Sequence, residues 1–410
     1  MATMTTDILI LGAGLGGYAA FQTLKKELHT HGLSQKITIV DQHNYFSFTP
    51  MHHEVASGSI EPAHCTIPMR ELTHNTPHTF LRARVIAVHP EEKRVETTAG
   101  DIRYAYCVVA LGSTINYGNI PGAETHSHHV RHLPNAIALH DAMIRACEGT
   151  TKEINVCIVG GGATGVEMAG QFAYLLKRDI RRLYPEKKTS VSLVQYDATL
   201  VPHLPKALQK AVHRHLKKMG VSIHLSSAVK EVRQDAILLH TGLELPSTIT
   251  IWTAGFHNIG LHILPESWCD RGRIPVTAHM THPRSEHLYA IGDIAFARNP
   301  GDEQPLPQLG EVAHDEGRYV GNHIARTIRN KTMKPFVYRS KGTLLPIGDW
   351  YGIGTIGPFL LNGLFAWWLR RTVYVLLMPK LSRKIRIVVD WTLRLFGFSS
   401  TVLLDNRQDR

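Results

Sequence analysis

The sequence predicts an α/β protein with two parallel β-sheets, and two observations support this fold class. A short apolar run, typical of a buried parallel strand, is followed at once by glycines at the spacing GxGxxG and then by a helical pattern, in LILGAGLGG from Leu9 to Gly17. The same arrangement returns in VCIVGGGATGVE from Val156 to Glu167. The first glycines of the two copies are 148 positions apart (160 minus 12). This repetition indicates two related α/β lobes in one chain.

The glycines of each copy point to a Rossmann-like dinucleotide-binding domain. In a strand–turn–helix unit the first glycine forms the tight turn, the second lets the backbone approach a pyrophosphate, and the third lets the helix pack closely on the strand. The phosphates then lie at the helix N-terminus, where N–H groups and the helix dipole favour anions. One such motif is weak evidence. Two in the correct context predict two nucleotide sites, at Gly12, Gly14 and Gly17 and at Gly160, Gly162 and Gly165.

A site of this type also uses an acid at the end of the second strand to bind the ribose hydroxyls. The run KITIVDQHN predicts a strand that ends at Asp41, so the first site can hold the adenosine ribose of FAD or NAD. In the second unit the strand SVSLVQYD ends in Gln195, where an acid is expected. Two alternatives stay open. Asp197 can substitute, because residues two apart on a strand face the same side, or the missing carboxylate admits the 2′-phosphate of NADPH.

Three further strand ends extend this pattern. VVALGS is a buried strand that closes on Gly112, and TITIWTAGF has the same form at Gly255. LYAIGDIAF places Gly292 and Asp293 at a strand end, where a carboxylate can accept a hydrogen bond from a ribityl hydroxyl. Because they accompany two glycine units in this order, these strand ends predict a flavin site in the first lobe.

Composition argues against several other classes of protein. With 43% apolar and 19% charged residues, the 410-residue chain is an ordinary globular protein of two or three domains. Its five cysteines include no CxxC pair, which argues against a redox-active dithiol or a zinc site and favours reduced thiols. The 26 histidines form no compact ligand pattern, so no metal site is expected. The N-terminus lacks a basic segment before its apolar run and is not expected to be a signal peptide.

The C-terminal region from Phe336 to Arg410 combines positive charge with the most apolar segments of the chain. Eleven Lys and Arg against four Asp give it +7 (11 minus 4) of the chain's +11. In RKIRIVVDWTLRLFGF a polar stripe recurs at three- and four-residue steps on an otherwise apolar helix, at Arg383, Arg386, Asp390 and Arg394. Such a basic amphipathic helix predicts docking on an anionic bilayer surface. A core or dimer-interface helix pair is the alternative.

A membrane-spanning helix fits this region less well, because glycines, Pro358 and the pair Arg370-Arg371 interrupt the apolar run. The region also contains no recognised nucleic-acid module, so no nucleic-acid partner is expected.

Over nearly its whole length the chain resembles a type II NADH dehydrogenase, the single-chain, non-pumping NADH:quinone oxidoreductase among the flavoproteins with two dinucleotide-binding domains. The matching segments are GAGLGG with Asp41, NYFSFTPMHHEVASG, GGGATGVEMAG, AIGD, EVAHDEGRYVGNHIA, KGTLLPIG and the aromatic, basic C-terminal region. The resemblance implies a non-covalent FAD on the first unit, NADH on the second with NADPH as the open alternative, and a membrane quinone as acceptor. It also implies a homodimer and a peripheral membrane protein, on the cytoplasmic face of a bacterial inner membrane or on the mitochondrial inner membrane of a eukaryote.

The resemblance further implies roles for particular residues. Glu167 would lie close to the nicotinamide and the flavin, Lys341 at the edge of the flavin and quinone pocket, and Glu311 in the quinone-site segment, which makes these three the predicted catalytic residues. The segment of Thr49 and Pro50 would approach the flavin ring and bring His52 and His53 near it. The predicted cofactor-binding residues are Gly12, Gly14, Gly17, Asp41, Thr49, Pro50, Gly112, Gly160, Gly162, Gly165, Gln195, Gly255, Gly292, Asp293 and Ala313.

Two departures from the family pattern bear on function. Gln195 replaces the second ribose-binding acid, and the Gln-rich quinone segment AQxAxQQG reads GEVAHDEG here, with Glu311 and Asp315 in place of glutamines. These carboxylates can bond a quinone carbonyl if protonated, or they indicate a different acceptor. A membrane-associated NAD(P)H oxidoreductase or sensor with a non-quinone acceptor is therefore the alternative function. Disulfide reductases and sulfide:quinone reductases need paired cysteines that the chain lacks.

The predicted layout has three parts. A discontinuous FAD domain comprises residues 1–150 and 261–335, an inserted NAD(P)H domain comprises residues 151–260, and a membrane-association region comprises residues 336–410.

Overall fold

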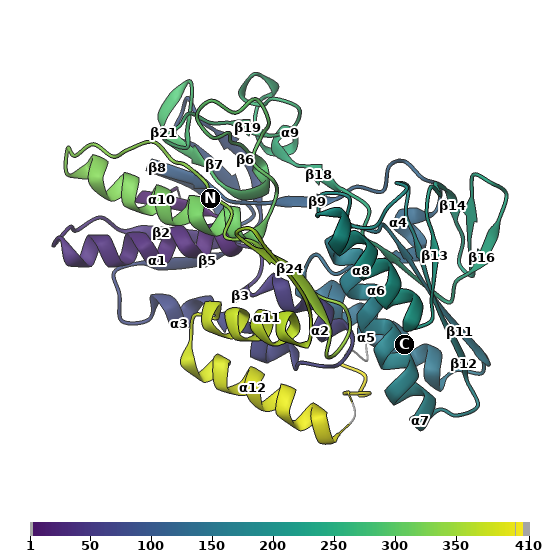
Figure 1. The fold of residues 1–410 in the computed structure, drawn as a ribbon. Helices are drawn as coiled ribbons and strands as arrows, with labels where there is room; N and C mark the ends of the chain where they lie inside the picture. Colours follow the sequence, from purple (N-terminus) through teal and green to yellow (C-terminus); the bar gives the residue numbers. More distant parts are fainter. Residues whose placement is uncertain (1–2, 398, 405–410) are drawn as a thin grey trace. The chain divides into compact units, whose positions relative to one another are not determined.

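The computed structural model describes residues 3–397 and 399–404, which form two compact units (Figure 1). The first unit contains the chain up to Phe48 together with Thr66–Thr114 and Phe256–Ser340. The second contains Thr49–Cys65, Ile115–Gly255 and the chain from Lys341 on. Residues 49–65 and 115–150 thus cluster with the second glycine unit rather than the first. The predicted domains were defined by the nucleotide each would hold, so their boundaries stay a prediction.

The first unit is built on an eight-stranded sheet in the order β20-β21-β8-β1-β2-β5, in which β7 also pairs with β8 and β6 with β7. The strands from β21 to β5 are parallel, as the buried apolar runs predict. Their bounds are β1 Met4–Leu11, β2 Ile37–Asp41, β5 Thr79–Arg82, β6 Val85–His89, β7 Arg94–Thr97, β8 Gly100–Val109, β20 Thr281–His282 and β21 Ser285–Ala290.

Helices α1 (Leu15–Thr30) and α10 (Gly310–Ile328) lie side by side in this unit (Figure 1). Two glycines of α10 permit the close approach, because a Cβ at Gly317 would overlap the carbonyl oxygen of Gly16 and one at Gly321 would lie 2.8 Å from Thr23 Cβ. The unit also contains α3 (Met69–Thr73), α9 (Gly260–Ile263), the pair β3 (Tyr45–Ser47) and β4 (Thr66–Pro68), and the pair β19 (Ile274–Pro275) and β22 (Ala295–Phe296).

The second unit contains a fully parallel five-stranded sheet in the order β10-β17-β11-β12-β13. An antiparallel three-stranded sheet, β14-β15-β16, is inserted in the chain between β13 and β17, and its apolar side chains share a buried cluster with β11, β12 and β17. The bounds are β10 Ser127–His128, β11 Glu153–Val159, β12 Lys188–Val194, β13 Val221–His224, β14 Val229–Val232, β15 Ala236–Leu239, β16 Glu244–Pro246 and β17 Ile249–Trp252.

The helices of the second unit begin with the short α2 (His52–Ala56), which follows a single 3-10 turn at Thr49–Met51. After α4 (Ala123–His126) and α5 (Leu133–Glu148) comes α6 (Ala163–Leu175), which continues through one π-helical turn, Leu176–Ile180, into α7 (Arg181–Leu183). Helix α8 (Lys206–Lys218) follows β12. Strands β9 (Ser113–Ile115) and β18 (Phe256–Asn258) lie where the chain passes from one unit to the other.

The C-terminal region belongs to the second unit and forms a small antiparallel sheet followed by two helices. The sheet consists of β23 (Thr343–Pro346), β24 (Gly352–Ile356) and β25 (Phe359–Gly363), and the helices are α11 (Leu364–Leu377) and α12 (Leu381–Phe396). The apolar stretch from Trp350 is thus divided between two strands and a helix. Within residues 3–397 and 399–404 no helix is both long and apolar enough to cross a bilayer. Residues 398 and 405–410 of the predicted membrane-association region lie outside the described chain.

Part of the polar stripe predicted on α12 faces the protein, whereas Arg386 of the same stripe is exposed. Asp390 accepts a hydrogen bond from His64 at 2.6 Å, and the buried guanidinium of Arg394 lies 3.4 Å from the Asp349 carboxylate. The exposed side of α12 is mostly apolar and also carries Arg386; its large exposed hydrophobic side chains are Leu381, Ile385, Val388, Val389, Leu393, Leu395 and Phe396. A helix with this orientation presents its hydrophobic residues to the surroundings, which is the arrangement expected of an interfacial helix.

Candidate active site

The first glycine turn has the geometry of a pyrophosphate site. Gly12 adopts φ +98°, and its N–H donates to the Val40 carbonyl at 2.8 Å, so the turn is fixed to the end of β2. A Cβ at Gly17 would overlap the carbonyl oxygen of Gly12, so α1 can start this close to β1 only because residue 17 is a glycine. At Gly14, the N-cap of α1, a Cβ would find no atom within 4 Å. The turn therefore leaves open space in front of a helix N-terminus, as an anion requires.

Asp41 occupies the predicted ribose position at the end of β2. One of its carboxylate oxygens accepts the Ala13 N–H at 2.7 Å and the other accepts the His43 N–H at 2.8 Å. These bonds fix the carboxylate beside the glycine turn, and a two-oxygen acceptor retains capacity for ribose hydroxyls.

Gly292 and Asp293 stand at the end of β21, as predicted. Gly292 adopts φ +73°, and the Asp293 carboxylate accepts the Ser113 hydroxyl at 2.8 Å. The Gly292 N–H donates to the carboxylate of Glu316 at 2.5 Å. Burial raises the pKa of Glu316 to about 8, against the lowering effects of the Gly292 hydrogen bond and the Arg273 charge. Glu316 was missed at the level of sequence, although it also replaces a glutamine of the family segment.

The N-terminus of α10 lies next to this turn. A Cβ built on Gly292 would be 3.3 Å from Ala313 Cβ, and one on Gly16 would be 3.1 Å from the Ala313 carbonyl oxygen. Gly112 precedes β9 with φ +73°. Glu311 and Asp315 are half-buried on α10. Ala313 thus lies beside both the first glycine turn and the Gly292 turn, whereas Thr49 and Pro50, also predicted for the FAD site, belong to the second unit.

The second glycine turn repeats this arrangement. Gly160 adopts φ +106° and donates to the Val194 carbonyl at 2.8 Å, and a Cβ at Gly165 would overlap the Gly160 oxygen. Gly162 caps α6 with no atom within 4 Å of a built Cβ. Gly255, with φ +88°, follows β17.

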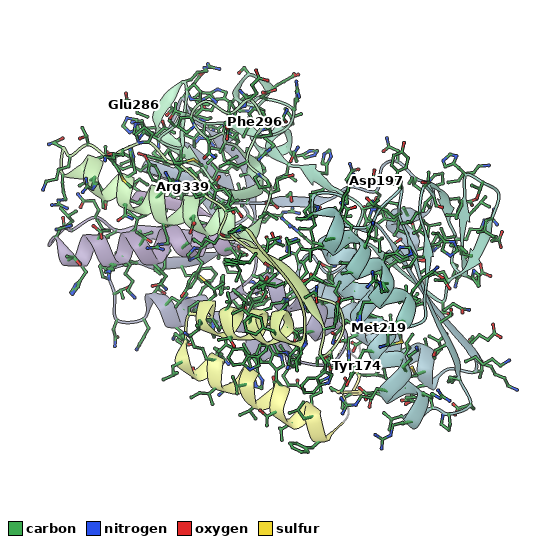
Figure 2. The ribbon with its side chains drawn as sticks, in the orientation of Figure 1. Tyr174, Asp197, Met219, Glu286, Phe296 and Arg339 are labelled. Carbon is green, nitrogen blue, oxygen red and sulfur yellow. The ribbon has the colours of Figure 1, made fainter. Side chains whose placement is uncertain are left out.

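Gln195 takes the place of the ribose acid in this turn. Its side-chain oxygen accepts the Gly161 N–H at 2.6 Å, and its amide group donates to the Asp197 carboxylate at 2.7 Å. Asp197, labelled in Figure 2, is exposed. A carboxylate is therefore present at the second turn, two residues beyond the expected position and held there by Gln195.

Glu167 projects from α6 into a charged cluster formed within the second unit. Its carboxylate lies 3.5 Å from Nη2 of Arg370 on α11, and the same guanidinium lies 3.4 Å from Glu54 on α2. Burial raises the pKa of Glu167 to about 7; the Arg370 charge opposes this shift and the Glu54 charge adds to it. Glu167 is thus a carboxyl group that can exchange a proton near neutral pH, as general acids and bases do.

The segment from Thr49 to His53 lies beside this cluster. The carbonyl oxygen of Pro50 accepts a hydrogen bond from Arg370 Nη2 at 3.2 Å. Burial lowers the pKa of His52 to about 4 and of His53 to about 3, so both imidazoles are neutral at pH 7. Lys341 is exposed, just before β23. The roles predicted for these residues, and for Glu167 and Glu311, stay predictions.

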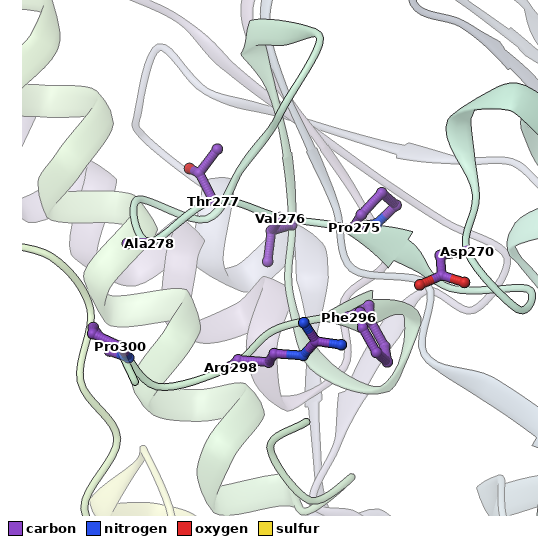
Figure 3. Close-up of a pocket in the computed structure, with 8 residues that line it drawn as sticks. All are labelled: Asp270, Pro275, Val276, Thr277, Ala278, Phe296, Arg298 and Pro300. Atoms are coloured by element: carbon purple, nitrogen blue, oxygen red, sulfur yellow. The ribbon is translucent and has the colours of Figure 1, made fainter. Parts of the chain in front are cut away.

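The first unit contains a pocket of about 350 Å³. The residues that line it, drawn in Figure 3, are Asp270, Pro275, Val276, Thr277, Ala278, Phe296, Arg298 and Pro300. The guanidinium of Arg298 lies over the Phe296 ring at 4.7 Å from its centroid. None of the predicted site residues lines this pocket. Among the described residues there is also no group of His, Cys, Asp and Glu that could hold a metal ion.

Comparison with known proteins agrees with this geometry. A probable NADH dehydrogenase of Dictyostelium discoideum is 25% identical, covering 94% of this chain and 88% of its own. A type II NADH:quinone oxidoreductase of Staphylococcus epidermidis is 24% identical, covering 87% and 91%. The solved structure of NDH2 from Plasmodium falciparum in complex with NADH matches with a TM-score of 0.87 at 17% identity, covering 97% of this chain and 99% of that one. These matches confirm the resemblance and the fold class predicted from the sequence.

The family itself follows from a match over most of the chain. The sequence model of the pyridine nucleotide-disulphide oxidoreductases matches residues 6–317, which include both glycine turns and the Gly292-Asp293 turn. The chain therefore belongs to the pyridine nucleotide-disulphide oxidoreductase family.

Proposed function

We propose that the chain is a type II NADH:quinone oxidoreductase, which oxidises NADH through FAD and reduces a membrane quinone without pumping protons. The observation that carries the proposal is the presence of two complete dinucleotide turns in a chain in which four of the five thiols are buried and the fifth, Cys269, is half-buried. Two nucleotide sites indicate electron transfer from one bound nucleotide to the other. Thiols that stay protonated favour a final electron acceptor other than a disulfide.

The thiols are unsuited to redox chemistry in spite of the family's name. Cys65, Cys107, Cys147 and Cys157 are buried. Burial raises the pKa of Cys147 to about 11 and of Cys157 to about 12, so both remain protonated at pH 7. Because the thiolate is the reactive form of cysteine, neither residue is a candidate for attack on a disulfide.

The first turn fits FAD. The open space at Gly14 accommodates a pyrophosphate at the N-terminus of α1, Asp41 is fixed to receive the adenosine ribose, and Asp293 would bind the ribityl chain. When bound, FAD supplies the ability to take a hydride from a nicotinamide and to pass electrons to a second acceptor.

The second turn fits NADH. Gly162 offers open space for the pyrophosphate, and the Asp197 carboxylate beside Gln195 would accept hydrogen bonds from the adenosine ribose hydroxyls. The same carboxylate would repel the 2′-phosphate of NADPH, since like charges in contact are unfavourable. We therefore infer NADH as the preferred donor.

Glu167 of the second unit would exchange a proton during turnover. Reduction of a quinone to a hydroquinone consumes protons, and Glu167, with its pKa near 7, would take up and release one close to the nicotinamide. His53 is neutral and buried, and its Nε2 lies 3.4 Å from Nη2 of Arg370, so it would help to exclude water from this place. Lys341, just before β23 in the same unit, would contact the acceptor.

Access to a membrane quinone would come through α11 and α12. Their exposed side chains include Trp368, Leu377, Leu393 and Phe396, the last 87% exposed. Arg386 on α12 is exposed beside them, so anionic lipid would attract the same surface. This arrangement supports a peripheral location at an inner membrane. A homodimer stays an expectation from the family.

The test is steady-state turnover of the FAD-loaded protein with NADH and a short-chain quinone, with the hydroquinone product measured directly. We expect stoichiometric NADH oxidation and hydroquinone formation, and a higher rate with a long-chain quinone when anionic phospholipid vesicles are present. NADH oxidation without hydroquinone formation would instead favour a different acceptor or a sensor role.

A further inference from the structure

Arg370 is the largest fully buried side chain in the described residues, with 1% of its surface exposed. A guanidinium withdrawn from water needs partners on several sides. Its Nη1 lies 3.4 Å from Glu54 and its Nη2 lies 3.5 Å from Glu167. Nη2 also donates to the Pro50 carbonyl oxygen at 3.2 Å, and the group lies over the Tyr374 ring, 4.2 Å from its centroid. One cation is therefore shared between two carboxylates that come from α2 and α6.

The two carboxylates have unequal surroundings. The Glu54 carboxylate, on a residue 3% exposed, accepts the indole N–H of Trp391 at 2.6 Å. Although its burial acts to raise the pKa of Glu54, the charges of Arg371 and Arg370 and the Trp391 hydrogen bond bring it below the usual value. The charged groups that act on Glu167 are Arg370 on α11 and Glu54 on α2. Glu54 is thus the carboxylate that stays ionised, and its negative charge favours a proton on Glu167.

This division of two carboxylates into an anion and a proton carrier is a recurring way of assigning acid and base roles. Here the groups that impose it on Glu54 come from the C-terminal helices, with Arg370 and Arg371 on α11 and Trp391 on α12. A hydrogen-bonded anion held by three such groups has little tendency to take a proton itself. The neighbouring His53 contributes no proton near pH 7, because burial lowers its pKa to about 3.

We propose that Arg370 and Glu54 are positioning residues for Glu167, which share one ion pair so that residues of the C-terminal helices decide whether Glu167 carries a proton. This inference rests on the proposed function for the meaning of that proton, but its geometry does not depend on it. The two positioning residues must act in opposite directions. Without Arg370 the proton on Glu167 is held more tightly, and without the charge of Glu54 it is held less tightly.

The experiment is a pH titration of the protonated-carboxyl band in infrared difference spectra of the FAD-loaded protein, with the Glu167 band identified by its loss in E167Q. We expect a midpoint near 7 in the wild type. In R370Q the midpoint should rise by about one pH unit or more, as expected when an opposite charge in contact is removed. In E54Q it should fall, since the like charge is gone and Arg370 is left to Glu167 alone. R181Q, which changes an exposed arginine of α7 in the same unit, should leave it unchanged.

Opposite shifts support the proposal, and a merely structural role would not produce them. Equal or absent shifts in R370Q and E54Q would overturn it. Loss of the buried cation can prevent R370Q from folding. In that case E54Q and R370K test the proposal, and R370K, which keeps the positive charge, should keep the midpoint within the range of the wild type. The pH dependence of quinone reduction should shift in the same directions. A wild type that titrates as expected but reduces no quinone would contradict the proposed function and leave this inference standing.

Discussion

The two glycine turns share the same backbone and differ in the side chain that closes them. In both, the N–H of the first glycine donates to a carbonyl oxygen near the end of the neighbouring strand at 2.8 Å, in the pairs Gly12–Val40 and Gly160–Val194. In both, the next N–H is accepted by a side chain at the strand end, Asp41 at 2.7 Å and Gln195 at 2.6 Å. The scaffold is therefore set by glycine and strand geometry, whereas the chemistry offered to a ribose is set by one position.

The difference shows how the side-chain amide of Gln195 can hold the Asp197 carboxylate at the second turn. Asp41 presents its own charge, whereas Gln195 uses its oxygen for the turn and its amide group for Asp197. The second turn thus has its charge on an exposed loop residue, where it is free to face a nucleotide without disturbing the strand end.

The largest effect should come from placing a charge in the open space of each turn. Gly14 and Gly162 have extended backbones and room for a side chain, so G14D and G162D should fold. A carboxylate beside a pyrophosphate costs several kcal/mol, or about 100-fold in affinity or more. We expect G14D to be purified without FAD and G162D to keep FAD but to lose reduction by NADH. Loss of FAD in G162D would show that the two turns do not hold separate nucleotides. G14A and G162A are the matched controls.

The next largest effect concerns Asp41. D41N keeps the shape but removes the charge from the acceptor of the Ala13 N–H, and hydrogen bonds to charged groups are worth about 1.5–3 kcal/mol. The affinity for FAD, measured by fluorescence quenching, should fall roughly 10- to 100-fold. The NADH affinity should not change, and an equal loss at both sites would indicate a general destabilisation instead.

A smaller effect is expected for nucleotide choice. D197N removes the carboxylate that Gln195 holds, so the ratio of kcat/KM for NADH over NADPH should fall by about 10-fold, the effect of one lost charge contact. Q195E, which adds a carboxylate at the strand end, should raise the ratio. If D197N leaves the ratio of kcat/KM for NADH over NADPH unchanged, Asp197 does not contact the adenosine ribose.

The smallest effect concerns pH and Glu316, the buried carboxyl group of the first unit. Its pKa is raised to about 8, so its contribution to stability is present at low pH and is lost as pH rises from about 4.5 to about 8. The Tm of the wild type should fall over this window more than that of E316Q, whose amide oxygen can still accept the Gly292 N–H. Parallel pH profiles for the two proteins would contradict the raised pKa.

The sequence was sufficient to predict those parts of the fold that depend on residues close together in the chain. Glycine spacing and apolar runs predicted both parallel sheets, the strand end at Asp41 and the turn at Gly292, because each depends on residues within a few positions of one another. The chain resemblance then indicated the enzyme class. The position of Gln195 was predicted, but its hydrogen bond to Asp197 required coordinates.

The charged cluster around Arg370 could not be predicted in this way. Glu54, Glu167 and Arg370 are distant in the chain and meet only when α2, α6 and α11 pack together. The same holds for α12, whose amphipathic pattern was evident from the sequence. Asp390 and Arg394 of its polar stripe turn toward the protein and find partners there, whereas Arg386 is exposed. Periodicity identifies the two faces of a helix, and only packing decides which of them is buried.

The most direct test of the central claim is anaerobic rapid mixing of the FAD-loaded protein with NADH, followed by mixing of the reduced protein with a short-chain quinone. We expect fast bleaching of the flavin absorbance by NADH, slower bleaching by NADPH, and fast recovery on addition of the quinone. Absence of bleaching, or bleaching without recovery by any quinone, would contradict the claim that the two turns pass electrons from NADH to a quinone.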